Sequence, residues 1–392
     1  MFCYIASIDN TGVVKRFHYY LSRQLIGDGT EIRMKKELEF NNNKYIITEC
    51  WNYYRVELAL QDEGNIPWYI ENFIQYEIYD DFVSFYYEPN SQDWASPNYD
   101  EVISYKECKY GEDVKEIIEN AIDLDGYPML YVDMEYLRSE GWYHELLIIG
   151  YDTEEEKYKC VVKIDKAPFW IVEEYSIDKV IKAFELGRDY FYKDIKSSII
   201  LSSLHYPFTI LSVNHGNDRR VRINRVYNSI NLMLNSCETG VIGEQTYAEE
   251  DIRWQCKYRG VGIYKVFFGK LYEILKEENM SFLLKYKQPI LSLKKLEENK
   301  KGMIYRIRYL EENGYIKNGD AIISGYKKIV TYVRISLNLL EKFIITENLK
   351  CIDSFAIYMK KASLLEAIIL KEILNKIEES YIENERKISK TL

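Results

Sequence analysis

The spacing of apolar and polar residues predicts a mixture of helices and strands in the first part of the chain. Residues 50–61 (CWNYYRVELALQ) place apolar side chains at helical spacing, and Gly64 marks the end of that pattern. Residues 111–122 predict a second helix. The apolar run at 128–134 (PMLYVDM) predicts a strand.

A hairpin and then a long helical region follow along the chain. Residues 144–151 and 158–165 flank a polar turn, which predicts a β-hairpin. After residue 176 helical periodicity dominates, and Gly and Pro become rare. We therefore predict an α+β domain at 1–185 and a mainly helical domain at 186–392. The helices predicted from this periodicity are 176–186, 224–235, 261–278, 292–311, 319–345 and 352–385.

Charge is distributed unevenly between these two parts. The whole chain has a formal net charge of −10. Residues 1–185 contain 37 acidic and 18 basic residues, which leaves 25 acidic and 34 basic residues for the remainder. Such a difference indicates separate domains with different partners. The C-terminal helices combine apolar stripes with charged residues, a pattern typical of bundle helices with solvated outer faces.

The cysteines indicate neither a metal site nor a disulfide scaffold. They stand at positions 3, 50, 108, 160, 237, 256 and 351, an odd number without a C-x-x-C pair. The first residues carry Asp9 and lack the basic start of a signal peptide, and no apolar run approaches about 18 residues. We expect a soluble cytoplasmic protein that needs no metal or other cofactor and does not bind a membrane.

Cys50 is the candidate nucleophile because it stands where a predicted helix begins. Residues 45–48 have an extended pattern, and the helical pattern starts at Trp51. The positive end of a helix dipole lowers the pKa of a thiol placed there. A lone cysteine is also common as a small buried apolar residue, so catalysis requires a partner base as well.

His144 is the candidate base, and Asp165 is the residue expected to orient it. His144 is one of four histidines and opens the strand HELLIIGYD. If the hairpin turn is centred between Glu154 and Glu155, Tyr151 faces Tyr158, Ile148 faces Val161 and His144 faces Asp165 across the hairpin. The carboxylate would then fix the imidazole tautomer that accepts the thiol proton. A shift of one residue would separate the two side chains. The structural alternative is that His144 is a buried core residue whose hydrogen bonds are all made and which has no catalytic role.

The order of these residues resembles that of papain-like enzymes. A cysteine begins a helix, a histidine opens a strand ending in G-Y-D, and an aspartate ends the next strand. The segments CWNYYRVELALQDEG and YPMLYVDMEYL…YHELLIIGYD resemble, more narrowly, the N-terminal domain of the butirosin biosynthesis protein H family. In that family a D-x-x-Y-L stretch precedes a histidine strand ending in G-Y-D. The resemblance covers residues 45–185, and the matching residues are Asp133, Tyr136, Leu137, His144, Gly150, Tyr151 and Asp152.

The resemblance implies a papain-like catalytic domain at 1–185 in which Cys50, His144 and Asp165 are catalytic. It further implies acyl transfer from a thioester on an acyl or peptidyl carrier protein to a small amine in antibiotic biosynthesis. The closthioamide amide synthase is a similar enzyme. Two alternatives stay open: a peptidase or amidase that uses the same residues with water as acceptor, and a papain-like binding module without chemistry. One departure is Lys44, because papain-like enzymes often carry a glutamine there as an oxyanion donor.

Three further residues are expected to bind substrate beside the catalytic pair. Trp51 and Tyr143 are the sequence neighbours of Cys50 and His144. Asp133 has two interpretations, because its carboxylate either lines the site or closes its strand in contact with solvent.

A basic cluster near the start of a predicted helix has two interpretations that stay open. It consists of Arg219, Arg220, Arg222 and Arg225. In one interpretation the cluster docks an acidic carrier protein. In the other it is a charged face that is either solvated or docked on the acidic first part of the chain. Nucleic-acid binding is disfavoured, because the whole protein is acidic and no recognition motif accompanies the arginines.

Overall fold

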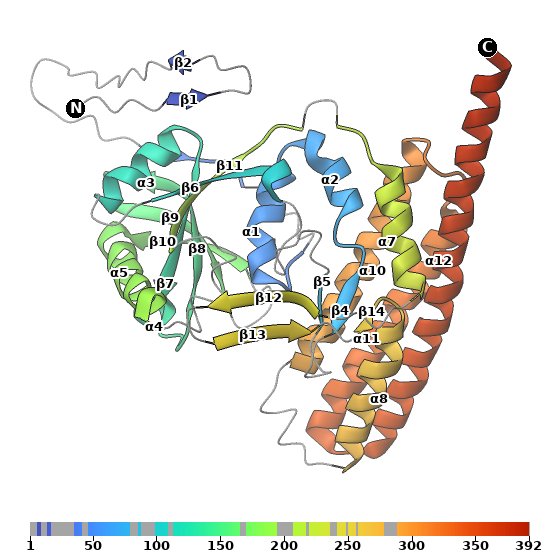
Figure 1. Cartoon of the computed structure of the whole chain (residues 1–392). Coiled ribbons are helices and arrows are strands. Elements are labelled where there is room, and N and C mark those ends of the chain that lie inside the picture. Colours follow the sequence, from blue (N-terminus) through green and yellow to red (C-terminus); the bar gives the residue numbers. More distant parts are fainter. Residues whose placement is uncertain are drawn as a thin grey trace, which may run out of the picture.

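The computed structural model of the chain combines an antiparallel sheet, short helices around it and a group of long C-terminal helices (Figure 1). The α+β class and the helical character of the C-terminal region, both predicted from the sequence, are confirmed. The structure describes residues 6–8, 14–16, 35–40, 46–78, 85–87, 99–108, 113–164, 170–193, 207–216, 219–235, 241–247, 250–255, 258–277 and 288–391.

The main sheet has seven strands within the described ranges, and each strand is antiparallel to its neighbours. Their order is β10-β9-β8-β7-β11-β6, and β3 pairs with β8. These strands are β3 (Lys35–Glu37), β6 (Ile103–Glu107), β7 (Tyr127–Asp133), β8 (Tyr143–Asp152), β9 (Lys157–Lys163), β10 (Trp170–Ser176) and β11 (Phe208–Val213). The smaller sheets are β1 (Ala6–Ile8) with β2 (Val14–Arg16), β12 (Val241–Tyr247) with β13 (Glu250–Gln255), and β14 (Tyr258–Arg259) with β4 (Tyr76–Ile78) and β5 (Phe85–Tyr87).

The β8–β9 hairpin has the predicted pairing near its turn and a different pairing further along. Tyr151 faces Tyr158, as the sequence predicts. An irregularity between Ile148 and Gly150 shifts the register, so that Ile148 faces Cys160. The predicted pairing of Ile148 with Val161 is therefore wrong by one residue, because a bulge inserts an extra residue into one strand.

The helices follow the periodicity of the sequence closely. In the first part they are α1 (Cys50–Ala59), α2 (Ile66–Glu71), α3 (Val114–Asp123), α4 (Met134–Arg138) and α5 (Ile177–Lys193), with 3₁₀ turns at Glu63–Asn65 and Tyr99–Glu101. The second part contains α7 (Ile223–Asn235), α8 (Gly262–Glu277), α10 (Gln288–Glu312), α11 (Asp320–Thr346) and α12 (Leu349–Thr391). The predicted helices at 50–61, 111–122 and across the C-terminal region are confirmed.

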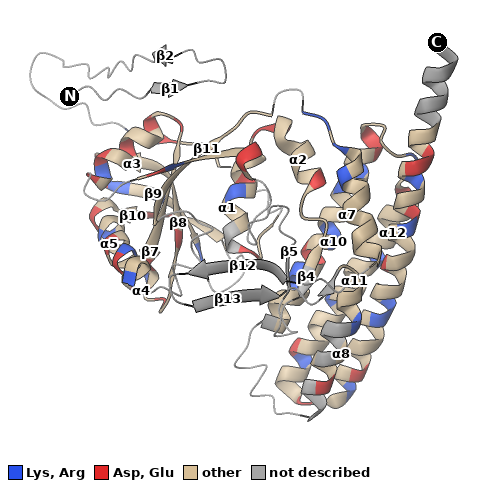
Figure 2. Ribbon diagram, viewed as in Figure 1, with Lys and Arg blue, Asp and Glu red and all other residues tan. Residues whose placement is uncertain are grey.

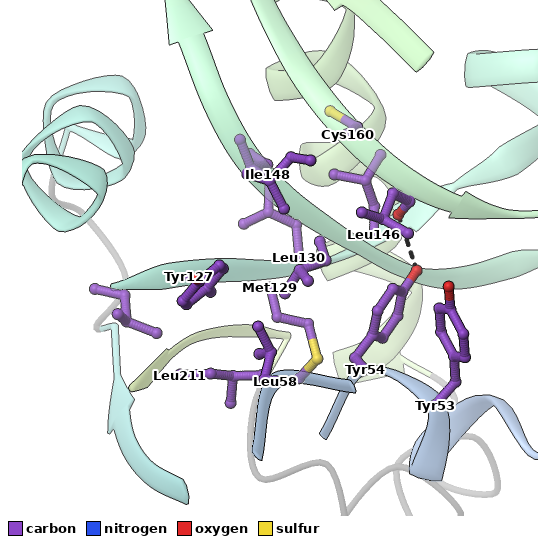
Figure 3. Close-up of a cluster of buried hydrophobic side chains, with 14 of the residues drawn as sticks. Tyr53, Tyr54, Leu58, Tyr127, Met129, Leu130, Leu146, Ile148, Cys160 and Leu211 are labelled. Atoms are coloured by element: carbon purple, nitrogen blue, oxygen red, sulfur yellow. Dashed lines mark hydrogen bonds between the residues drawn. The ribbon is translucent and has the colours of Figure 1, made fainter. Parts of the chain in front are cut away.

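From Asn52 onward, helix α1 is buried on every side. Residues 52–60 are all buried, including polar ones. Tyr54 and Leu58 point towards Met129 and Leu211 of the main sheet (Figure 3). A helix that is buried all round needs covering on more than one face. Figure 1 shows how this is achieved, because α1 lies between the main sheet and the long C-terminal helices.

The chain passes from the first part to the second without a linker at residues 185 and 186. That predicted boundary falls within α5, which packs against β7. The following strand, β11, lies between β7 and β6 in the main sheet. The part of the chain that builds the main sheet therefore extends to Val213.

Candidate functional site

Cys50 is the first residue of α1, as the sequence predicts. Glu49 precedes it in an extended conformation, and its carbonyl oxygen accepts from the backbone N–H groups of Asn52 (3.1 Å) and Tyr53 (3.0 Å). The N–H groups of a first helical turn point away from the helix and attract negative charge, which favours a thiolate at this position. The side chains of Cys50 and Trp51 lie outside the described residues.

His144 is buried in β8 in a defined tautomer. Its side-chain Nδ1 lies 3.0 Å from the carbonyl oxygen of Glu145. A carbonyl oxygen can only accept a hydrogen bond, so Nδ1 carries the proton and Nε2 keeps its lone pair. The neutral ring in this tautomer can take up a proton at Nε2.

The surroundings of His144 hold its imidazole neutral near pH 7. Burial lowers the pKa of His144 to about 4, and the nearby ammonium of Lys163 is the second cause. Glu145 and Glu140 act in the opposite direction on this pKa. An imidazole with this pKa is neutral near pH 7 and available to accept a proton, although it is a weaker base than one whose pKa lies near the operating pH.

Trp170, the first residue of β10, links His144 to the segment before Cys50. Its indole N–H donates to the carbonyl oxygen of Ile47 over 2.9 Å. The Trp170 ring stacks on Tyr53 of α1 with centroids 4.0 Å apart, and its centroid lies 6.0 Å from that of His144. Trp170 was not predicted as a site residue; its only signal in the sequence is its position at the start of the alternating stretch WIVEEYS.

Tyr54 and His144 bind the same backbone carbonyl. The single proton of the Tyr54 hydroxyl is shared between the carbonyl oxygens of Glu145 (3.1 Å) and Val161 (3.0 Å), and His144 Nδ1 donates to that of Glu145. Figure 3 shows Tyr54 extending from α1 towards β8 and β9. Tyr54 lies four residues after Cys50, a rise of about 6 Å along the helix axis. The start of α1 and the strand that carries His144 are therefore joined directly.

Half-buried side chains surround the ring of His144 on another side. The Trp142 ring centroid lies 5.2 Å from that of His144. Lys163 Nζ lies 5.1 Å from the Trp142 centroid, a cation–π contact. The Trp142 indole N–H donates to the Glu140 carboxylate over 3.0 Å. Because Trp142, Lys163 and Glu140 are all partly exposed, they mark the solvent-facing side of the imidazole.

The predicted orienting residue Asp165 lies outside the described residues, as does Lys44. The register of the β8–β9 hairpin nevertheless affects the expected position of Asp165 relative to His144. The last described pair of β8 and β9 is Leu146 with Val162, and continuing that register places residue 164 opposite His144. Direct opposition of His144 and Asp165 therefore does not follow from the hairpin, and the orienting role of Asp165 stays a prediction.

Asp133 and Tyr143 have structural contacts. The Asp133 carboxylate accepts from the backbone N–H of Tyr136 at 3.1 Å and so caps α4. The Tyr143 ring stacks on Tyr190 of α5, with centroids 3.9 Å apart, whereas the ring of the next residue, His144, contacts two tryptophans. Asp133 thus supports α4 and Tyr143 packs on α5, and their binding of substrate stays a prediction.

The G-Y-D motif fixes β8 in place. A Cβ atom at Gly150 would lie 2.8 Å from the carbonyl oxygen of Lys36, so glycine permits the close approach of β3. The Tyr151 hydroxyl donates to Asp123 at the end of α3 (2.8 Å). The Asp152 carboxylate accepts from two backbone N–H groups of the following turn, each at 3.0 Å. The motif therefore supports the strand that carries His144.

Three arginines of the basic cluster bind Glu71 and Glu101, two acidic residues of the first part of the chain. Arg222 Nε donates to Glu71 over 2.7 Å, and its guanidinium also reaches Glu101 at 2.8 Å. The other two, which contact Glu101 as well, are Arg219 and Arg225. Figure 2 shows basic residues along the segment that enters α7, beside α2. This geometry favours the interpretation in which the cluster docks within the chain, whereas Arg220 is exposed.

No family model and no curated protein matches this chain. Among the helices that the structure describes, none has the length and apolar character needed to span a bilayer.

Proposed function

We propose that this protein is a cysteine-dependent acyltransferase with Cys50 as nucleophile and His144 as base. The observation that carries the proposal is the Glu145 carbonyl, which binds both Tyr54 and His144. Tyr54 follows Cys50 by one helical turn, so the bond brings the start of α1 towards the imidazole strand. A thiol at a helix start and a neutral imidazole are the groups that thiol catalysis requires.

The proposed reaction has two halves joined by an acyl-enzyme. His144 takes the proton of the Cys50 thiol as the sulfur attacks the carbonyl carbon of a thioester. The tetrahedral intermediate collapses, and the leaving thiolate takes the proton from the imidazolium. An amine then attacks the acyl-Cys50 carbonyl and loses its proton to His144. Cleavage of the carbon–sulfur bond releases the amide, and the Cys50 sulfur recovers the proton.

The substrates that we propose follow from the sequence resemblance. The acyl donor is a thioester on an acyl or peptidyl carrier protein, and the acceptor is a small amine, in natural-product biosynthesis. A papain-like fold is part of the proposal, and a buried helix that begins at the cysteine and packs on an antiparallel sheet supports it. We also propose a cytoplasmic location, because Cys50 must stay reduced and the buried Cys160 and Cys351 are free thiols.

Intact-protein mass spectrometry with carrier-bound thioesters tests this proposal. We expect a mass increase equal to the acyl group, localised to Cys50 and discharged by amines with formation of an amide. Cys50→Ala should not gain the mass. Cys108→Ser is the matched control, because Cys108 is a partly exposed cysteine that follows β6 rather than opening a helix.

Other outcomes of this experiment identify the alternatives. Discharge of the acyl group by water at the same rate with and without amines would identify a hydrolase, a peptidase or amidase. Absence of any adduct with thioesters, amides and peptides would leave a binding module and refute catalysis by Cys50.

A further inference from the structure

We infer that Glu298 of α10 is a positioning residue for Cys50, acting through the backbone that enters α1. The inference rests on the proposed function, because the position of Cys50 matters for chemistry if its sulfur reacts. Glu298 belongs to the helical second part of the chain, which the sequence alone does not connect with the candidate site.

Three donors in the segment before Cys50 converge on the Glu298 carboxylate. Oε2 accepts from the backbone N–H groups of Ile47 (2.7 Å) and Thr48 (3.1 Å), and Oε1 accepts from the Thr48 hydroxyl (2.8 Å). Thr48 and Glu298 are only 8% and 9% exposed, so water competes little for these bonds. Hydrogen bonds to an ionised carboxylate are stronger than neutral ones. Glu298 therefore fixes the direction in which the chain enters the helix.

A second contact from α10 reaches the residue directly before Cys50. Lys295 Nζ lies 3.1 Å from the carboxylate of Glu49, and both side chains are buried. The other carboxylate oxygen of Glu49 accepts from the side-chain amide of Asn52 at 2.6 Å. A buried negative charge beside a thiol disfavours the thiolate, and the ammonium of Lys295 offsets that effect. Both contacts of α10 thus act on the position and charge at the start of α1.

Lys295 and Glu298 belong to a polar face of α10 that binds the first part of the chain. Asn299 donates to two consecutive carbonyl oxygens after α2 (3.2 and 3.1 Å). Arg306 donates to two carbonyl oxygens at the end of α2 (3.1 and 3.3 Å). Gly302 lies between them, where a Cβ atom would come within 2.8 Å of the Arg306 guanidinium. This face follows helical spacing, and it holds the chain both before and after α1.

The rate of Cys50 alkylation by iodoacetamide, measured across pH with peptide mass spectrometry, tests the inference. Glu298→Gln keeps the shape of the side chain but replaces the anion and one acceptor oxygen. Glu297→Gln is the matched control, because Glu297 neighbours it on α10 and binds Lys301 and Arg334 at the surface (2.7 Å each). Alkylation reports on the thiol directly and requires no substrate.

We expect Glu298→Gln to slow Cys50 alkylation at neutral pH by about tenfold, because a thiol displaced from the helix start loses stabilisation of its thiolate and one pKa unit changes the thiolate fraction about tenfold. Loss of the Glu298 charge by itself favours the thiolate, whereas displacement of Cys50 from the helix start disfavours it. We expect the displacement to dominate, so the pH midpoint of alkylation should rise, and kcat for acyl transfer should fall with KM unchanged. Glu297→Gln should stay within about twofold of the wild type, because surface ion pairs contribute little. Restoring the anion with Glu298→Asp should recover part of the rate.

Two results would overturn the positioning role of Glu298. One is a folded Glu298→Gln protein that alkylates as fast as the wild type, and the other is an equal loss in both glutamine variants. If Glu298→Gln does not fold, Thr48→Val removes one of the three bonds and should slow alkylation by about threefold. A wild-type Cys50 that alkylates rapidly but gains no acyl group from thioesters refutes the proposed function and leaves the positioning role intact.

Discussion

Tyr54 of α1 and His144 of β8 donate to one carbonyl oxygen, that of Glu145, at 3.1 and 3.0 Å. Tyr54→Phe removes this link and keeps the ring that packs against the sheet. We expect a loss of about 1 kcal/mol in the free energy of unfolding. Acyl-enzyme formation should also slow, because α1 is then held less firmly against the histidine strand.

Tyr53→Phe provides the matched control for this prediction. Among the described residues, the buried hydroxyl of Tyr53 has no hydrogen-bond partner, although its ring stacks on Trp170. Removing it should leave the free energy of unfolding unchanged or raise it, because a buried unsatisfied hydroxyl is unfavourable. Urea unfolding and single-turnover acylation of both variants check the pair. Equal effects of the two substitutions would mean that the hydrogen bonds of the Tyr54 hydroxyl to Glu145 and Val161 contribute nothing.

His144 should make the stability of the protein depend on pH. Burial lowers the pKa of His144 to about 4, whereas an unfolded histidine titrates near 6.5. The unfolded state therefore binds one more proton than the folded state between these values. The contribution of His144 to the free energy of unfolding is fully present above pH 6.5 and is lost as the pH falls towards 4, by about 3 kcal/mol in total.

His144→Asn isolates this contribution from that of the carboxylates. Urea unfolding at pH 7 and at pH 4.5 should show a smaller loss on acidification for the variant than for the wild type. If the two proteins lose the same free energy between those pH values, His144 does not titrate with a depressed pKa.

The pattern of the sequence predicted local structure well and long-range contacts poorly. The helices at 50–61 and in the C-terminal region, the strand at 128–134 and the turn of the β8–β9 hairpin depend on nearby residues, so periodicity reveals them. Periodicity does not reveal the bulge near Ile149, because the apolar and polar residues around it alternate in the same way with either register.

The burial of the charged residues on α10 could not be predicted from the sequence either. Lys295 and Glu298 belong to a helix whose pattern predicts solvated charges, yet both are buried against the segment before Cys50. A charged position on an amphipathic helix looks the same in sequence whether it faces solvent or another part of the fold. The candidate nucleophile and base were therefore found from sequence, whereas the residues that support them were not.

Lys300 of α10 and Glu366 of α12 form an ion pair that is fully buried in the helical region. Tyr264 donates to the same carboxylate over 2.6 Å, and Lys300 Nζ lies 3.1 Å from the Tyr76 hydroxyl. Lys300→Met should lower the free energy of unfolding by about 3–5 kcal/mol, because it leaves a buried charge without its partner.

A double-mutant cycle distinguishes this pair from two independent contributions. The double variant Lys300→Met with Glu366→Leu should be more stable than the sum of the two single effects predicts, because neither charge then remains alone. Urea unfolding of the four proteins gives the coupling free energy. Additive effects would show that the two charges do not stabilise each other.

Asp165→Asn tests the role that the sequence assigns to this residue. If Asp165 holds the imidazole N–H, the amide allows a less useful tautomer, so kcat should fall while the circular-dichroism spectrum stays unchanged. Full activity would remove Asp165 from the site and leave the Glu145 carbonyl as the acceptor that fixes the tautomer of His144.

The basic cluster gives a prediction in which Arg222 and Arg220 should behave differently. Arg222 binds Glu71, a buried carboxylate, so Arg222→Ala should cost about 2 kcal/mol of unfolding free energy. Turnover should then fall in parallel for a carrier-bound thioester and for a small thioester such as an N-acetylcysteamine derivative. Arg220 is exposed, and Arg220→Ala should leave both the stability and the small-thioester rate unchanged. A rise in KM for the carrier-bound donor alone, in the Arg222 variant, would instead show that the cluster docks the carrier.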